Sequence, residues 1–225
     1  MNETTEERSV AEDNEIQFSG WLQWPARFFS YLLHPIFLPA YVSVYLTLLH
    51  PLLFVGFSYE ERLKTILIVF LNTTAFPLIT VLLLKALGFV SSIQLVTQKD
   101  RIIPYIASGI FYFWAYTVFK EQTDYPVILS VFLLGIFLSS SAALLANIYY
   151  KVSMHAIGMG GVAGLFVILF FQNNLLPGWP LSAAFLLSGI VGTSRLILKS
   201  HSAFDIYSGF FIGLLMQAVA YYFAG

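Results

Sequence analysis

Two residues near the C-terminus, His201 and Asp205, stand four positions apart in a chain where charge is scarce. On a helix, residues with this spacing share one face. We therefore expect the Asp205 carboxylate to accept the proton of one imidazole nitrogen, leaving the other nitrogen of His201 free to attack. Arg195 lies six positions upstream of His201, and its guanidinium fork matches phosphate oxygens. The segment predicts phosphate chemistry.

The composition indicates a membrane protein. Of the 225 residues, 58% are hydrophobic and 10% are charged, whereas soluble domains have about 25% charged residues. The mean hydropathy is +0.79. A net charge of −1 gives no electrostatic reason to expect a nucleic-acid partner. Because the sequence contains no cysteine, disulfide and thiolate chemistry are excluded for it.

The apolar runs predict an all-α, polytopic membrane bundle of about six or seven transmembrane helices, since crossing a bilayer takes about 20 residues. The first run contains His34, Pro35 and Pro39 and is the one to omit if the number is six. Residues 1–15 are acidic and are expected to be disordered, and 16–225 are expected to form one domain. The predicted spans are 28–49, 64–87, 103–119, 126–149, 155–172, 181–198 and 203–223.

The joints between spans predict that the polar residues gather at one membrane face. A chain returns to the same face after every second crossing, so the joints after the second, fourth and sixth spans lie together on the N-terminal side. The excess of Lys and Arg there favours the cytoplasm, but a phosphate site needs these cations on either side, so sidedness stays open. The joints hold Lys99, Arg101, Lys151, Ser153, His155, Arg195, Lys199, His201 and Asp205.

Three segments together resemble a known family. Residues 194–205 (SRLILKSHSAFD) reproduce Ser-Arg-x5-His-x3-Asp, the third signature motif of the type 2 phosphatidic acid phosphatase (PAP2) superfamily, which is related to the vanadium haloperoxidases. Residues 152–155 (VSMH) resemble its second motif, Pro-Ser-Gly-His, and keep the serine and the histidine. Residues 99–104 (KDRIIP) resemble its first motif with a different spacing. The resemblance is strongest over about 95–225, for which it implies a PAP2-like core.

The resemblance implies a phosphohistidine mechanism. His201 would attack phosphorus, and Asp205 would fix the tautomer of its ring and stabilise the charged imidazole. His155 would protonate the leaving alkoxide and later activate water. Neither a metal nor another cofactor is implied. The implied phosphate ligands are Arg195, Arg101, Lys99 and Ser153.

The function implied by the resemblance is hydrolysis of a phosphomonoester or diphosphate on a membrane lipid, by an integral protein of the bacterial inner membrane. The expected partners are the lipid bilayer and the lipid phosphate. Two alternatives stay open: a lipid phosphotransferase that uses the same intermediate, and a catalytically degenerate protein that binds or transports lipid phosphates. The second is suggested by Met154, where the family has glycine, and by the displaced first motif.

The remaining polar residues are interpreted as structural. His34 and His50 lie outside the motifs and are taken as packed or interfacial side chains. Lys151 and Lys199, at span ends, are taken as topology signals or snorkelling residues. Glycines near the start of the fifth span are expected to let helices approach closely.

Overall fold

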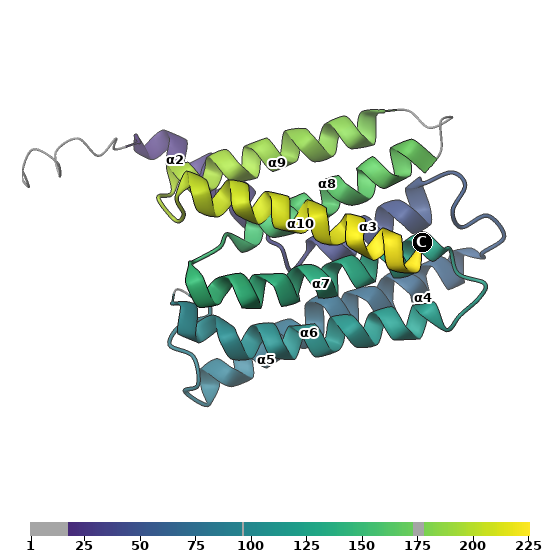
Figure 1. Ribbon diagram of the computed structural model, residues 1–225, viewed down its shortest axis with the longest axis horizontal. Helices are drawn as coiled ribbons and strands as arrows, with labels where there is room; N and C mark the ends of the chain where they lie inside the picture. Colours follow the sequence, from purple (N-terminus) through teal and green to yellow (C-terminus); the bar gives the residue numbers. More distant parts are fainter. Residues whose placement is uncertain (1–17, 96, 173–177) are drawn as a thin grey trace, which may run out of the picture.

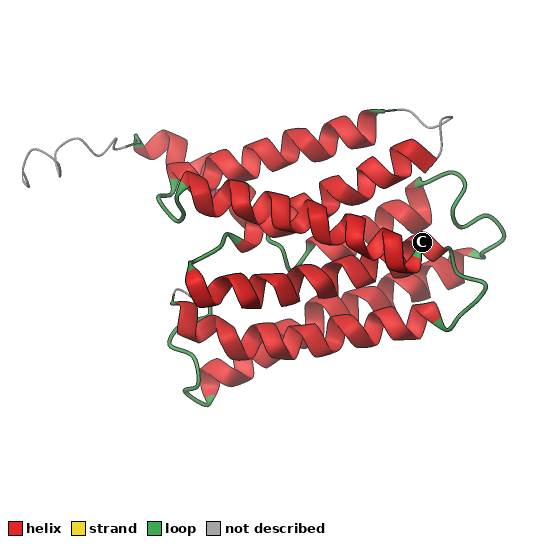
Figure 2. Cartoon of the chain, in the orientation of Figure 1, coloured by secondary structure: helices red, strands yellow, loops and turns green. Residues whose placement is uncertain are grey.

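The computed structural model describes residues 18–95, 97–172 and 178–225, so the prediction for residues 1–15 lies outside it. Regular structure in this part of the chain is helical throughout (Figure 2), which confirms the predicted all-α class. The helices are α2 (Gly20–Leu32), α3 (Leu38–Val44), α4 (Tyr59–Phe70), α5 (Phe76–Ala86), α6 (Gln98–Lys120), α7 (Val127–Tyr149), α8 (Met154–Gln172), α9 (Trp179–Ile197) and α10 (Ala203–Ala224), with π-helical turns η1 (Tyr45–Leu49) and η2 (Leu71–Ala75).

Within the described ranges, six helical segments are long and apolar enough to cross a membrane, so the protein is a multi-pass membrane protein. One of them, Tyr59–Ala86, joins α4, η2 and α5 into a single segment of 28 residues. The π-helical turn η2 directly precedes α5, whose second residue is Pro77. Because a proline ring crowds the carbonyl four residues back, a widened turn at this point lets the segment continue. The other five segments are α6 to α10.

The first apolar run is divided in two. α2 ends at Leu32, and a tight turn follows in which the Phe37 N–H donates to the His34 carbonyl at 2.9 Å. The turn is encoded by two prolines: Pro35 disfavours continuation of α2, and Pro39 lies in the first turn of α3, where its missing N–H costs no helical bond. The run therefore contains no continuous spanning helix among the described residues, which agrees with the prediction that it is the run to omit if six helices cross the membrane.

The two halves of this run lie toward opposite ends of the bundle. α2 lies at the end where α9 meets α10, on the left of Figure 1. At the other end, the ring of Tyr45 in η1 packs on Trp179 at the start of α9, with 6.5 Å between ring centroids. α2, the turn and α3 thus cross the bundle as two short helices.

Glycines hold α8 and α10 together, as the sequence predicted. A Cβ on Gly213 would lie 2.7 Å from the backbone nitrogen of Gly161, and one on Gly209 would lie 2.9 Å from the Ser153 carbonyl. A side chain at either position would force the two backbones apart. This close packing fixes α10, and the loop before it, against the first turn of α8.

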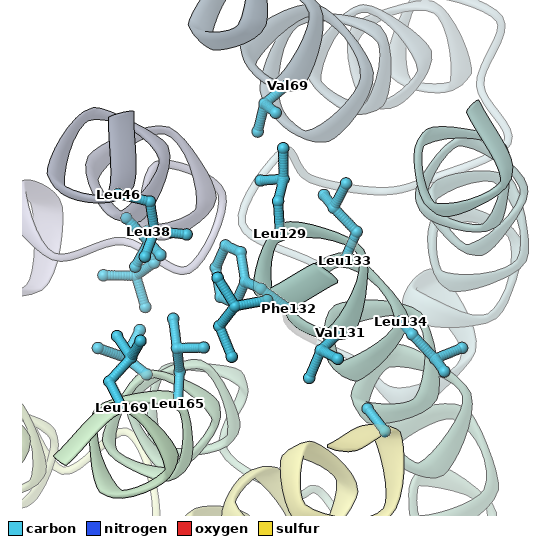
Figure 3. Close-up of a cluster of buried hydrophobic side chains, with 14 of the residues drawn as sticks. Leu38, Leu46, Val69, Leu129, Val131, Phe132, Leu133, Leu134, Leu165 and Leu169 are labelled. Atoms are coloured by element: carbon cyan, nitrogen blue, oxygen red, sulfur yellow. The ribbon is translucent and has the colours of Figure 1, made fainter. Parts of the chain in front are cut away.

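The largest hydrophobic cluster lies where α7 meets α3, α4 and α8. Figure 3 shows Phe132 of α7 directed toward α3 and α8, and Leu129 directed toward Val69 of α4. The connections α5–α6, α7–α8 and α9–α10 all lie at one end of the bundle, left in Figure 1. This arrangement confirms that the three predicted joints share one face.

Candidate active site

His201 lies in the short connection between α9 and α10. Ser202 caps α10: its hydroxyl accepts from the Asp205 N–H at 3.2 Å, and the Asp205 carboxylate accepts from the Ser202 N–H at 2.9 Å. This capping box starts the helix at Ala203. The expectation that His201 and Asp205 share a helical face is therefore wrong, and the N-terminal cap turn brings them near each other instead.

The main chain orients the ring of His201. Its Nδ1 lies 3.2 Å from the main-chain oxygen of Lys151 and 3.7 Å from Oδ2 of Asp205. A carbonyl oxygen only accepts, so Nδ1 carries the proton and Nε2 keeps its lone pair. Within the described residues, Nε2 has no hydrogen-bond partner. The His201 side chain is 3% exposed, and the residue lines the cavity described below.

Burial and neighbouring cations keep His201 neutral. Burial is the main cause that lowers the pKa of His201 to about 4, and Arg195, Arg101 and Lys151 add to it, while Asp205 opposes them. The same crowding of cations acts on Lys151, whose pKa is lowered first by burial and then by Arg101 and Arg195. The loops therefore form a positively charged pocket around an uncharged imidazole, which suits an anionic phosphate.

His155 lies in the first turn of α8 and is held by α2. Its Nε2 is 3.0 Å from the main-chain oxygen of Ser30, so Nε2 carries the proton in the neutral ring and Nδ1 is unprotonated. The Ser30 hydroxyl is 3.4 Å from Nη1 of Arg195, which donates to it. One residue at the end of α2 thus positions both a candidate acid and a candidate clamp.

Arg195 and Arg101 both line the cavity, but their guanidinium groups form different hydrogen bonds. Nε of Arg195 is buried and has no hydrogen-bond partner in the described part of the chain, so this guanidinium retains a donor for a ligand. Arg101 is 8% exposed. It donates from Nε to the Leu95 carbonyl at 2.9 Å and from Nη1 to the Val152 carbonyl at 3.0 Å. Arg101 therefore ties two connections together and presents its remaining donors to the cavity.

The other two predicted phosphate ligands lie away from the cavity. Lys99 is exposed on the first turn of α6, and it is absent from the residues that line the cavity. Ser153 is fully buried, and its hydroxyl accepts from the Ala156 N–H at 3.4 Å at the start of α8. Its own N–H donates to the Asp205 carbonyl at 3.2 Å. Ser153 thus caps α8 and joins it to α10.

Met154 occupies a helical position. It is the first residue of α8, and the only non-glycine residues with positive φ in the described ranges are Leu95 and Lys199. A methionine at this position, where the motif that the segment resembles has glycine, therefore carries no backbone strain. Its side chain lines the cavity, so the replacement alters the shape of the wall.

A cavity of about 500 Å³ connects these groups with the interior of the bundle. His155, His201, Arg101 and Arg195 line it beside apolar side chains of α3, α5, α7 and α8. Its volume falls in the range of small-molecule sites. The apolar lining includes Pro35, Leu38, Leu78, Val81, Ile136 and Val162.

Three groups of the candidate site could not be predicted from the sequence. The Lys151 carbonyl orients His201, and a main-chain acceptor leaves no mark in a residue pattern. Ser30 binds His155 across 125 positions of sequence, and nothing local signals that contact. The sequence predicts a packed or interfacial side chain for His34, whereas the structure places it in the lining of the cavity. Its one sequence signal was the helix break at Pro35.

The basic groups that line the cavity are the imidazoles of His34, His155 and His201 and the guanidinium groups of Arg101 and Arg195. Across the described ranges, no three His, Asp or Glu side chains form a group that could hold a metal ion. Comparisons with protein-family models, with curated proteins and with solved structures found no match to this chain.

Proposed function

We propose that this protein is a PAP2-like phosphatase of membrane lipid phosphates that works through a phosphohistidine at His201. One observation carries the proposal. His201 is a neutral imidazole with Nδ1 on the Lys151 carbonyl, and its unprotonated Nε2 shares a cavity with Arg195 and Arg101. A buried nucleophile beside fixed cations is what phosphoryl transfer requires, since most of its catalysis is positioning and charge stabilisation.

In the first step, Nε2 of His201 attacks phosphorus. The P–N bond forms while the bond from phosphorus to the lipid oxygen breaks. His155, with its Nε2–H on the Ser30 carbonyl, takes the proton of the bound phosphomonoester monoanion at Nδ1 and passes it to the departing alkoxide. Arg195 and Arg101 stabilise the charge on the equatorial oxygens.

In the second step, the neutral His155 takes a proton from water at Nδ1. The water oxygen attacks phosphorus, the P–N bond breaks, and inorganic phosphate leaves. His155 returns its Nδ1 proton to the departing phosphate, and His201 returns to the neutral tautomer held by the Lys151 carbonyl. The sum is one lipid phosphate and one water converted to one lipid alcohol and one phosphate.

The cavity supports a lipid as the substrate. Its charged end lies at the loops, and its apolar walls continue between the helices of the bundle. A phosphate bound at the charged end places the attached hydrocarbon against these walls, which favours a phosphate or diphosphate on a lipid chain over a soluble ester. We place the enzyme in a bacterial cell membrane.

The test is phosphate release by the purified protein in detergent or nanodiscs, using lipid phosphates with a radioactive phosphoryl group. We expect release of inorganic phosphate and, after an alkaline quench, a phosphorylated peptide that contains His201. The His201→Ala variant should form neither product.

The same assay distinguishes the proposed phosphatase from the two alternative functions. Transfer of the label to an added lipid alcohol, without release to water, would identify a phosphotransferase. Binding of vanadate with no turnover of any lipid phosphate would identify a binding protein and reject the proposal.

A further inference from the structure

We propose that His34, in the turn between α2 and α3, is a catalytic residue of this site that donates a hydrogen bond from Nε2–H to the transferring phosphoryl group. The inference rests on the proposed function and adds a residue from outside the motif segments. It arises from the break in the first apolar run, which brings a third histidine into the cavity beside His155 and His201.

The ring of His34 lies directly against the ring of His155. The ring centroids are 5.0 Å apart and the rings are nearly perpendicular, at 84°. Both rings line the cavity together with Arg195. His34 is thus a close neighbour of the candidate acid, and the phosphoryl group that His155 serves must lie within its surroundings.

The local backbone fixes which nitrogen of His34 carries the proton. Its Nδ1 accepts a hydrogen bond from the Ile36 N–H at 3.3 Å. In a neutral imidazole an accepting Nδ1 requires the proton on Nε2. The described residues supply no partner for that Nε2–H, so it is available as a donor to a ligand in the cavity.

A neutral donor at this point complements the two arginines. His201 supplies a lone pair, and the Nε2–H of His155 is already engaged by the Ser30 carbonyl. His34 adds an oriented N–H that keeps its proton throughout the reaction. Such preorganised donors act on the charge that develops in the transition state, and losing one typically lowers kcat by about 10²- to 10³-fold.

Pro35 restricts the movement of the turn that carries His34. Pro35 occupies the second position of the turn closed by the hydrogen bond from Phe37 to the His34 carbonyl, a position that fits its fixed φ. The backbone of Pro35 also lies near Gly158 of α8, where an added Cβ would meet the Pro35 side chain at 3.3 Å. The turn is therefore clamped against the helix that carries His155.

Two substitutions of similar size separate a donor role from a packing role. His34→Gln retains an N–H donor, whereas His34→Met removes it with little change in volume. We expect His34→Met to lower kcat by about 10²- to 10³-fold with a small change in KM. His34→Gln should keep most of the rate. The rate of phosphohistidine formation at His201 should fall in parallel with kcat.

His50 offers a matched control. It also precedes a proline, and its Nδ1 accepts from the Leu52 N–H at 3.3 Å, the same local geometry as at His34. It packs against Tyr45, with 6.0 Å between ring centroids, and lies outside the lining of the cavity. His50→Met should leave kcat unchanged while altering thermal stability.

Three outcomes would overturn the inference: equal losses of kcat in His34→Met and His34→Gln, equal losses in His34→Met and His50→Met, or a His34→Met rate near wild type. If His34→Met does not fold, His34→Phe takes its place. If the wild type hydrolyses no lipid phosphate, the proposed function fails on its own. Binding of orthovanadate then decides the role of His34: weakening in His34→Met alone supports the contact, and unchanged binding rejects it.

Discussion

Nδ1 of His201 lies closer to the main-chain oxygen of Lys151, at 3.2 Å, than to the Asp205 carboxylate, at 3.7 Å. The main chain of the α7–α8 connection therefore shares the orienting role that sequence reasoning gave to Asp205 alone. No substitution can delete that carbonyl. The consequences for mutagenesis differ from those of a side-chain dyad.

His201 and Asp205 should have unequal effects on phosphate release. His201→Ala removes the nucleophile and should abolish phosphoenzyme. Asp205→Asn leaves the tautomer on the Lys151 carbonyl, so we expect about a 10- to 100-fold loss, as for an outer-sphere partner. That is less than the roughly 10⁴-fold loss when an Asp that alone orients a histidine becomes Asn. Single-turnover rates with labelled lipid phosphate measure the difference, and equal losses in both variants would contradict it.

The imidazole of His201 should stay reactive toward electrophiles at acidic pH, down to about pH 4. Its pKa is lowered to about 4, so the ring stays unprotonated until the pH approaches that value. Diethyl pyrocarbonate modifies only the neutral imidazole, so modification of the His201 peptide, followed by mass spectrometry, should show a midpoint near pH 4. This measurement avoids the ionisation of the substrate phosphate itself. A midpoint near 6.5 would show that the loops do not depress the pKa.

The lowered pKa of His201 also predicts how the stability of the fold changes with pH. The unfolded chain binds a proton at His201 near pH 6.5 and the folded chain near pH 4. The contribution of this residue to folding is therefore complete above about pH 6.5 and is lost as the pH falls toward 4. The melting temperature of the wild type should therefore fall relative to that of His201→Gln as the pH is lowered from 6.5 to 4, and a difference that does not change with pH would contradict the shift.

Substitutions of Arg101 and of Lys99 should have very different effects on turnover and thermal stability. Arg101 spans two connections with hydrogen bonds to the carbonyls of Leu95 and Val152. A lysine cannot form that fork, so Arg101→Lys should lower both turnover and thermal stability. Lys99 is exposed and lies outside the cavity lining, and Lys99→Ala should stay within about twofold of wild type. A large loss of turnover in Lys99→Ala would restore the first-motif lysine to the site.

Ser153 should matter for stability and little for turnover. Its hydroxyl caps α8 by accepting from the Ala156 N–H, and loss of such a cap costs about 0.5–2 kcal/mol. Ser153→Ala should lower the melting temperature while kcat changes little. A loss of kcat at constant melting temperature would instead support the phosphate contact expected from the sequence.

Gly213 should tolerate no side chain. A Cβ there would lie 2.7 Å from the Gly161 nitrogen, and overpacking of this kind costs about 1–3 kcal/mol. Gly213→Ala should therefore reduce folded yield and melting temperature. Gly189→Ala on α9 is the control, because no atom lies within 4 Å of its added Cβ. Equal melting temperatures for the two variants would argue against tight α8–α10 packing.

The helices were predictable because hydropathy alone marks segments long enough to span a bilayer. The alternation of joints then placed His155, His201 and Arg195 at one end correctly. The start of α10 also has a sequence signal, since Ser202 and Asp205 have the spacing of a capping box.

The remainder of the site depends on contacts that carry no local pattern. The Lys151 carbonyl acts through the main chain, and its identity as lysine says nothing of that role. Ser153 has the residue type of a phosphate ligand, and only the three-dimensional packing shows its hydroxyl inside the cap of α8. His34 meets His155 because two prolines bend the chain, and the direction of a bend cannot be read from the prolines that cause it.

The end of α2 at Leu32 leaves helical carbonyls without partners inside the bundle, where water is scarce and an unpaired acceptor is costly. The Phe29 and Tyr31 carbonyls accept from the Leu33 and His34 N–H groups. The Ser30 carbonyl is satisfied by the His155 side chain. The proton donor of the proposed reaction therefore also completes the C-terminal end of the short helix α2. A substitution of His155 removes this hydrogen bond to the Ser30 carbonyl as well as the proposed proton donor. Enzymatic activity and membrane insertion of the protein should therefore be lost together.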